Sequence, residues 1–152
     1  MMMARYALPI LAAAGAACVL SAACAQAPTP VMQAFDHYEA IRASMADDQF
    51  DMVVQHAMAL SPLAGQVAGD EAQAAASRLA SATTINSARV EFISLSSALV
   101  PRFLEAKLDD VHGFMCALKD GRTALWAQRS AAIQNPYFGH SWPDCGEEIQ
   151  AP

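Results

Sequence analysis

The residues best suited to chemistry are sulfur and imidazole side chains in the last third of the chain. His112, Met115 and Cys116 lie in one short stretch, and His140 and Cys145 lie in another. Thiolate and thioether ligands select Cu(I), and imidazole suits copper or zinc. These five residues are therefore the candidate metal ligands, and Cu(I) is the candidate cofactor.

The N-terminal segment is typical of a secretory signal peptide. Residues 1–25 combine one Arg, an apolar run over residues 7–20 and small residues before the expected cleavage after Ala25. The run of roughly 14 residues is shorter than the roughly 20 that a membrane-spanning helix needs. We therefore expect a periplasmic or secreted protein. A lipid anchor at Cys24 is the alternative, although a lipoprotein signal usually carries Leu where this chain has Ser21.

Export gives Cys116 and Cys145, the two cysteines of the mature chain, a second interpretation. Two cysteines in an oxidising compartment most often form a disulfide. The loop of about 30 residues would make this bridge worth on the order of 3.5 kcal/mol in the chain-entropy model. Metal binding needs more: on an extended strand His112 and Cys116 are about 13 Å apart, and Met115 points to the opposite face. A metal here must recruit Cys145 and His140, and both interpretations stay open.

A smaller candidate lies near the start of a predicted helix. Met52 and His56 stand four residues apart, so they share a helix face and are close enough to hold one ion together. The alternative is ordinary packing, because Met fills gaps in cores and His is common at the flank of a helix.

Composition and motifs argue against several classes of function. The chain has 15 acidic and 9 basic residues and a net charge of −6, whereas nucleic-acid binding depends on Lys and Arg that neutralise phosphate. The sequence contains no nucleophile elbow, zinc-protease motif, phosphate loop or Cys-x-x-Cys. Acid pairs such as Asp47/Asp48 and Asp109/Asp110 are expected to be solvated helix caps. We expect no enzyme, no nucleic-acid partner and no transmembrane span in the mature chain.

Apolar periodicity predicts a mainly α fold, a four-helix antiparallel bundle with a small C-terminal β-hairpin and an irregular tail. After a short linker, residues 26–30, we expect a single domain over residues 31–152. The predicted helices cover about residues 31–45, 50–61, 70–82 and 85–103. Asp47 or Asp48 is expected to cap the second helix, and Ser61-Pro62 to end or kink it.

The texture of the chain changes at Val111. Two short apolar runs around Asp120-Gly121 predict a β-hairpin over about residues 111–130 that docks on the helices. One helical turn is expected at residues 131–134. A structural turn then follows at Asn135, Pro136, Tyr137, Phe138 and Gly139, in which the two aromatic rings anchor the turn to the bundle.

Two segments of the chain, "FDHYEAIRASMADDQFDMVVQHAMAL" and "ALWAQRSAAIQNPYFGHSWPDCGE", together resemble a known family. It is a bacterial exported domain of unknown function, found alone or fused to the C-terminus of periplasmic adaptors of copper and heavy-metal efflux systems. The resemblance covers nearly the whole mature chain. Its most specific part is the series Trp126, Asn135 to Gly139, and Cys145-Gly146.

The resemblance implies copper handling, with an efflux adaptor or another envelope protein as partner. His112, Met115 and Cys145 match the family pattern, whereas Gly113 and Phe114 replace its Cys-Pro, Trp142 replaces its Met, and Cys116 comes three residues late. Two functions are therefore carried forward. One is an exported accessory domain of copper homeostasis or efflux that binds or presents metal. The other is a disulfide-stapled helical interaction domain of the cell envelope that binds no metal.

Overall fold

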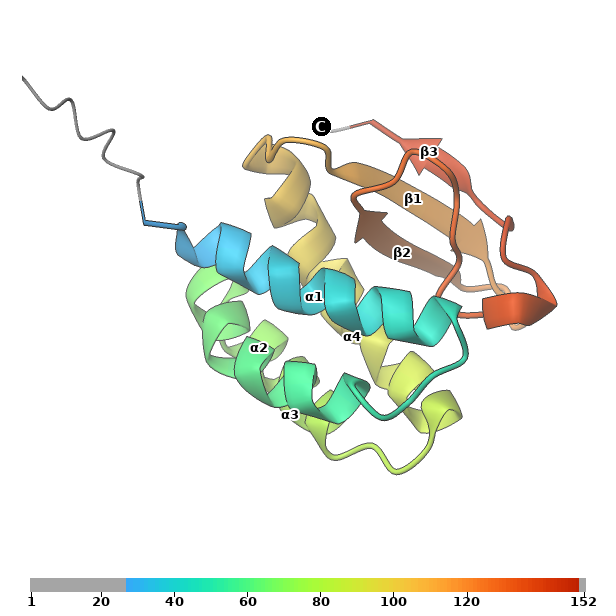
Figure 1. Ribbon diagram of the computed structural model, residues 1–152, viewed down its shortest axis with the longest axis horizontal. Coiled ribbons are helices and arrows are strands. Elements are labelled where there is room, and N and C mark those ends of the chain that lie inside the picture. The colour runs from blue at the N-terminus through green and yellow to red at the C-terminus, as the bar shows by residue number, and fades with distance from the viewer. Residues whose placement is uncertain (1–26, 151–152) are drawn as a thin grey trace, which may run out of the picture.

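The computed structural model describes residues 27–150, which form a mainly helical fold with a small three-stranded antiparallel sheet (Figure 1). The mainly α class predicted from the sequence is confirmed. The helices are α1 (Pro30–Ala46), α2 (Val53–Ala68), α3 (Asp70–Ala80) and α4 (Ile85–Glu105), followed by β1 (His112–Ala117), β2 (Thr123–Gln128), the 3-10 helix η1 (Gly139–Ser141) and β3 (Glu147–Ile149). The predicted signal peptide, residues 1–25 with Cys24, lies outside the described residues.

The helix starts follow from local sequence. Thr29 caps α1 by accepting a hydrogen bond from the Met32 amide, and Pro30 occupies the first turn, where its missing N–H costs nothing. Thr84 and Ser87 form a reciprocal capping box at the start of α4. Within residues 27–150, no helix is both long enough and apolar enough to cross a membrane.

Two expectations about α2 are wrong: an end at Pro62, as opposed to a kink there, and a cap from Asp47 or Asp48. The helix does not end at Pro62 but continues to Ala68, because Leu60 and Ala64 on either side of the proline are fully buried and hold the helix against its neighbours. The N-cap position, just before Val53, is occupied by Met52, which makes no side-chain cap, so Asp47 and Asp48 do not cap the helix. Asp47 instead follows the C-terminus of α1, and Asp48 adopts a left-handed conformation with φ of 55°.

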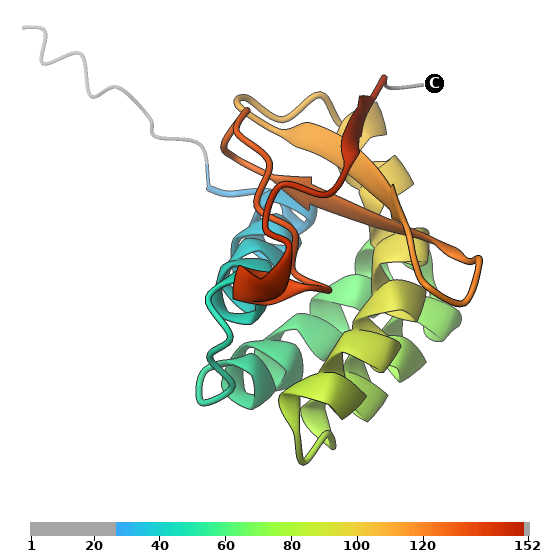
Figure 2. The same ribbon diagram turned by 90° about the vertical axis from the view of Figure 1, so that its right-hand side faces the viewer.

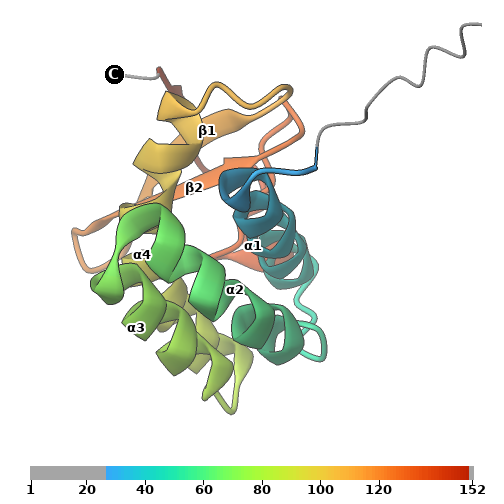
Figure 3. The same cartoon turned by 90° about the vertical axis from the view of Figure 1, so that its left-hand side faces the viewer.

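The core lies between the helices and the sheet. Helices α2 and α3 pack together on one side, while α4 and α1 contact the sheet on the other (Figures 1 and 3). The largest fully buried side chains come from both parts: Tyr38, Phe35, Ile41, Met45, Leu60, Leu79, Phe92, Leu95, Leu99, Phe103, Phe114 and Trp126. Burial of this aromatic and aliphatic surface is what joins the sheet to the helices.

The sheet has the strand order β2-β1-β3. Strands β1 and β2 pair antiparallel, with Phe114 opposite Trp126 and their rings stacked 5.5 Å apart. The tail is not wholly irregular as expected, because β3 pairs with β1, with Gly113 opposite Ile149. The helical turn expected at residues 131–134 does not form.

The reason that residues 131–134 stay irregular is a buried amide on β2. The Gln128 side chain is fully buried and donates to the carbonyls of Ser130 and Ala132. Its oxygen accepts from the Trp126 indole at 2.9 Å. Carbonyls that a helical turn would need are thus bound elsewhere.

Candidate functional site

Cys116 and Cys145, the two cysteines among the described residues, are joined in the structure. Cys116 on β1 and Cys145, just before β3, form a disulfide with a Cα–Cα distance of 6.1 Å. Cys116 is buried, whereas Cys145 is only partly buried. The bridge fixes the end of the chain to the central strand of the sheet, so we call residues 135–145 the stapled segment.

A buried asparagine organises the start of the stapled segment. Asn135 is fully buried, and its side-chain oxygen accepts hydrogen bonds from the amides of Tyr137 and Phe138 at 2.7 and 3.2 Å. Its side-chain nitrogen donates to the Cys145 carbonyl at 2.8 Å, and its backbone amide donates to the Pro143 carbonyl. Asn135 therefore joins the two ends of the stapled segment by hydrogen bonds, and the disulfide attaches the same end, at Cys145, to β1.

An ion pair connects the stapled segment to the helices. The Arg89 guanidinium on α4 donates to the Pro136 and Met45 carbonyls, each at 2.7 Å, and to the Asp48 carboxylate at 2.6 Å. Asp48 also accepts from the His140 amide at 2.9 Å. The hydrogen bond from Arg89 is the main reason that the pKa of Asp48 lies below its ordinary value. One arginine thus ties α1, α4 and the segment together.

Gly139 permits this close approach. It lies in the left-handed region with φ of 53°, and a Cβ atom there would fall 2.6 Å from the Arg89 guanidinium and clash with the Asp48 carboxylate. Figure 2 shows η1, which begins at this glycine, beside the C-terminal end of α1.

Aromatic side chains divide the segment into an anchored part and an exposed part. The ring of Tyr137 is buried against Phe92 and Trp126, and its hydroxyl donates to the Leu125 carbonyl; burial raises its pKa well above the ordinary value. Phe138 is partly buried and lies 5.6 Å from the ring of Trp142. Trp142 remains 53% exposed, so the segment presents one large aromatic ring to solvent.

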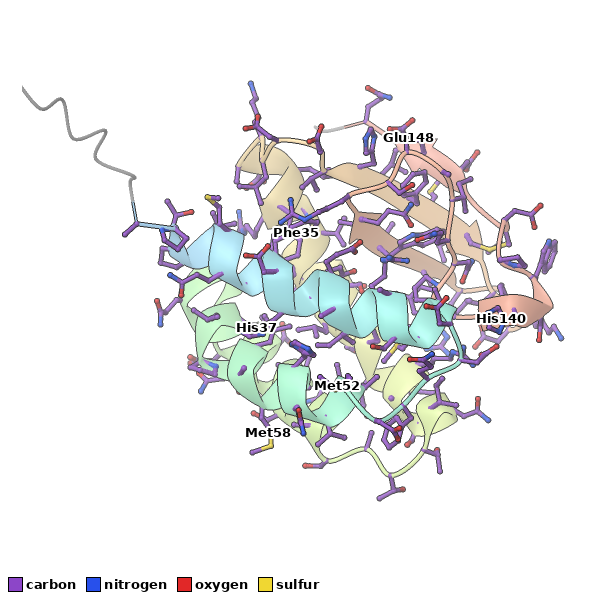
Figure 4. All side chains as sticks on the ribbon, in the orientation of Figure 1. Phe35, His37, Met52, Met58, His140 and Glu148 are labelled. Atoms are coloured by element: carbon purple, nitrogen blue, oxygen red, sulfur yellow. A yellow bond between two sulfur atoms is a disulfide. The ribbon has the colours of Figure 1, made fainter. Side chains whose placement is uncertain are left out.

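The predicted metal ligands fall in separate places. The imidazole of His112 pairs with Glu148 at 2.9 Å, and that of His140 faces Asp48 at 3.3 Å. Figure 4 shows His140 and Glu148 well apart. Within residues 27–150, no group of three or more His, Cys, Asp and Glu side chains comes together as a metal site would require. With the disulfide closed, the sulfurs of Cys116 and Cys145 are bonded to each other, so neither offers a thiolate to copper.

An open pocket of about 240 Å³ lies beside the disulfide. Its lining includes Met115, Cys116, Thr123, Cys145 and Glu147. Side chains alternate along β1, so Met115 points to the face opposite Cys116. The soft-metal ligands that this pocket could offer are therefore the two cysteine thiolates, and these form only when the disulfide is reduced.

Sequence reasoning found the turn residues and the cysteine pair but missed the arginine that holds them. Arg89 and Asp48 are 41 residues apart, and neither belongs to a local motif. One weak indication of a charged partner for Asp48 was present in the sequence: the segment between α1 and α2 contains three aspartates, Asp47, Asp48 and Asp51, which is more than one helix cap requires.

No family model, curated protein or solved structure matches this chain. The resemblance to the exported domain family stays a prediction, and so does the copper role that it implies.

Proposed function

We propose that this chain is a non-catalytic accessory domain of the cell envelope that docks on a protein partner through its stapled segment. The observation that carries the proposal is the exposure of Trp142 on a backbone held by the disulfide, by Asn135 and by Arg89. Tryptophan is enriched among the residues that dominate binding energy. A segment that is already ordered loses little conformational freedom when it binds.

The remainder of the chain serves this role as a platform. We propose that the four helices act as an antiparallel bundle and that the β1–β2 hairpin carries the disulfide on its inner strand. The support is the continuous contact from α2 and α3 through α1 and α4 to the sheet. Residues 26–152 would then be the exported form, periplasmic or secreted.

Site-specific photo-crosslinking in the native host tests the docking proposal. A photoreactive phenylalanine at Trp142 is expected to give one discrete crosslinked protein, and the same residue at Ala74, exposed on α3, is expected to give none. The crosslink should weaken when Cys145 is replaced by Ala, because the segment then loses its staple. Equal crosslinking from both positions, or none from Trp142, would overturn the proposal.

A second function, copper homeostasis or efflux, is favoured by the open pocket beside Cys116 and Cys145. A thiol reductant would convert the bridge into two thiols, whose thiolates select Cu(I). His112 and His140 contact Glu148 and Asp48 through Nδ1, so each keeps its Nε2 atom available for a metal. An efflux adaptor or another envelope protein would be the partner.

Thermal melts of the reduced protein test the second function. Reduced wild type should melt at a higher temperature with Cu(I), because a ligand that binds only the folded state stabilises it. Cys145→Ser should remove that gain. A reduced protein whose melting temperature does not respond to Cu(I) would end the copper interpretation of the cysteines.

A further inference from the structure

Two histidines that are distant in the sequence face each other between α1 and α2. The Nδ1 atoms of His37 and His56 lie 3.1 Å apart, and the ring centroids are 5.4 Å apart. The residues are separated by 19 positions, and both side chains are partly buried. Figure 4 labels His37 on α1 and Met52 at the start of α2.

The contact requires that at least one ring be neutral. In a hydrogen bond between two imidazoles, one ring nitrogen donates and the other accepts, and two imidazolium ions could not approach so closely. Burial, and then the charge of His37, lower the pKa of His56 below its ordinary value. Neutral imidazole is also the form that binds metal.

The spacing of the nitrogens suits a shared ion. Two imidazole ligands at roughly 2.0–2.1 Å from one metal, the Zn–N distance, hold their nitrogens about 3.3 Å apart at tetrahedral angles and about 3.5 Å apart in a planar three-ligand site. The observed 3.1 Å is within a few tenths of an ångström of these values. An ion could therefore replace the shared proton with little movement of either helix.

A thioether stands one helical turn from His56. The His56 amide donates to the Met52 carbonyl at 3.1 Å, so these residues occupy the same face at the start of α2. Met52 is 47% exposed, so its thioether is accessible to an ion from solvent. Met58, 64% exposed, lies two positions beyond His56 and so on a different face of the helix.

We propose that His37, His56 and Met52 form a binding site for a single soft monovalent metal ion, Cu(I) or its analogue Ag(I), between α1 and α2. Two imidazoles and one thioether favour such ions over zinc, calcium and magnesium. The site goes beyond the docking function and uses neither cysteine, so it operates with the disulfide intact. A bound ion would clamp α1 to α2.

Ag(I) titration of the oxidised protein tests the site, because silver needs no reductant that would open the disulfide. We expect one equivalent to bind and to raise the melting temperature, with changes in the imidazole nitrogen resonances of His37 and His56 but not of His112. His37→Asn and His56→Asn should each remove the effect. Met52→Leu removes a proposed ligand and should weaken binding by at least the roughly tenfold that loss of an outer-shell partner costs, whereas Met58→Leu, the matched exposed control, should not.

The result does not depend on whether the histidine variants fold well, because the resonances are measured on wild type. The double variant Cys116→Ala/Cys145→Ala should bind silver as wild type does, which separates this site from the cysteine pocket. Resonances of His37 and His56 that do not respond to silver would overturn the proposal. So would tighter binding of Zn²⁺ than of Ag(I), or an unchanged affinity in Met52→Leu.

Discussion

Opening the disulfide should cost a large part of the stability of this domain. The cysteines are separated by 29 positions. For a loop of that length the chain-entropy model gives about 3.6 kcal/mol at 25 °C. Domains of this size are typically stable by roughly 5–15 kcal/mol, so reduction should leave a folded but much weakened protein.

Urea unfolding followed by tryptophan fluorescence measures this loss of stability. Trp126 is fully buried at the sheet, so its emission changes when unfolding exposes its ring to solvent. Oxidised and reduced wild type are compared with Cys116→Ala/Cys145→Ala. The variant should resemble reduced wild type and should not respond to the reductant. This insensitivity distinguishes loss of the bridge from the small loss of packing at buried Cys116.

Amide exchange should locate the loss. The Tyr137 amide, which donates to Asn135, should exchange much faster after reduction, whereas amides in the middle of α4 should change only as far as global stability changes. A reduced wild type that unfolds within about 0.5 kcal/mol of the oxidised form would refute the reasoning. The hydrogen bonds of the segment would then hold it without the staple.

Three further predictions concern the contacts of the stapled segment. Gly139→Ala should lower the free energy of unfolding in urea by about 3 kcal/mol, because the added Cβ atom clashes with Asp48 and Arg89 in addition to straining the backbone. Gly121 also has a positive φ, 83°, but open space around it, so Gly121→Ala should cost about 1 kcal/mol. Equal costs would contradict the close approach at Gly139. Asn135→Ala should lower the free energy of unfolding by about 2–4 kcal/mol, because the amides of Tyr137 and Phe138 lose their hydrogen-bond acceptor. A decrease below about 1 kcal/mol would mean that these amides find another acceptor. Arg89 lowers the pKa of Asp48, so the Asp48–Arg89 ion pair stabilises the folded state. This contribution to the free energy of unfolding is complete above the ordinary pKa of 3.8 and is lost as the pH falls through the lowered pKa of the folded state. The melting temperature of Asp48→Asn should therefore lie below that of wild type at neutral pH, and a gap that fails to narrow in acid would contradict the ion pair.

Most of the secondary structure could be predicted from local patterns in the sequence. Apolar spacing predicted the helices, and Asp120-Gly121 marked the connection between β1 and β2, where Gly121 has a positive φ. The extension of α2 past Pro62 was not predictable, because burial of the residues on both sides outweighs the missing N–H. Strand β3 was missed because "EEI" has little strand propensity of its own and forms by pairing its backbone with β1.

The candidate site was less accessible to sequence reasoning. The spacing of Cys116 and Cys145 is compatible with either a disulfide or a metal site. The turn at Asn135 was predicted from the proline that follows it. The contact of Arg89 with Asp48 and that of His37 with His56 depend on how distant helices are rotated against each other. No local pattern fixes that rotation, because the packing of the whole core sets it.

The redox state of the cysteines in the exported protein tests the central claim most directly. Protein isolated from the cell envelope without reductant is alkylated, and the peptides that contain Cys116 and Cys145 are examined by mass spectrometry before and after reduction. The stapled segment predicts no alkylation of either cysteine before reduction and one alkyl group on each afterwards. Two alkylated cysteines before reduction would contradict the account and favour a thiol site for Cu(I).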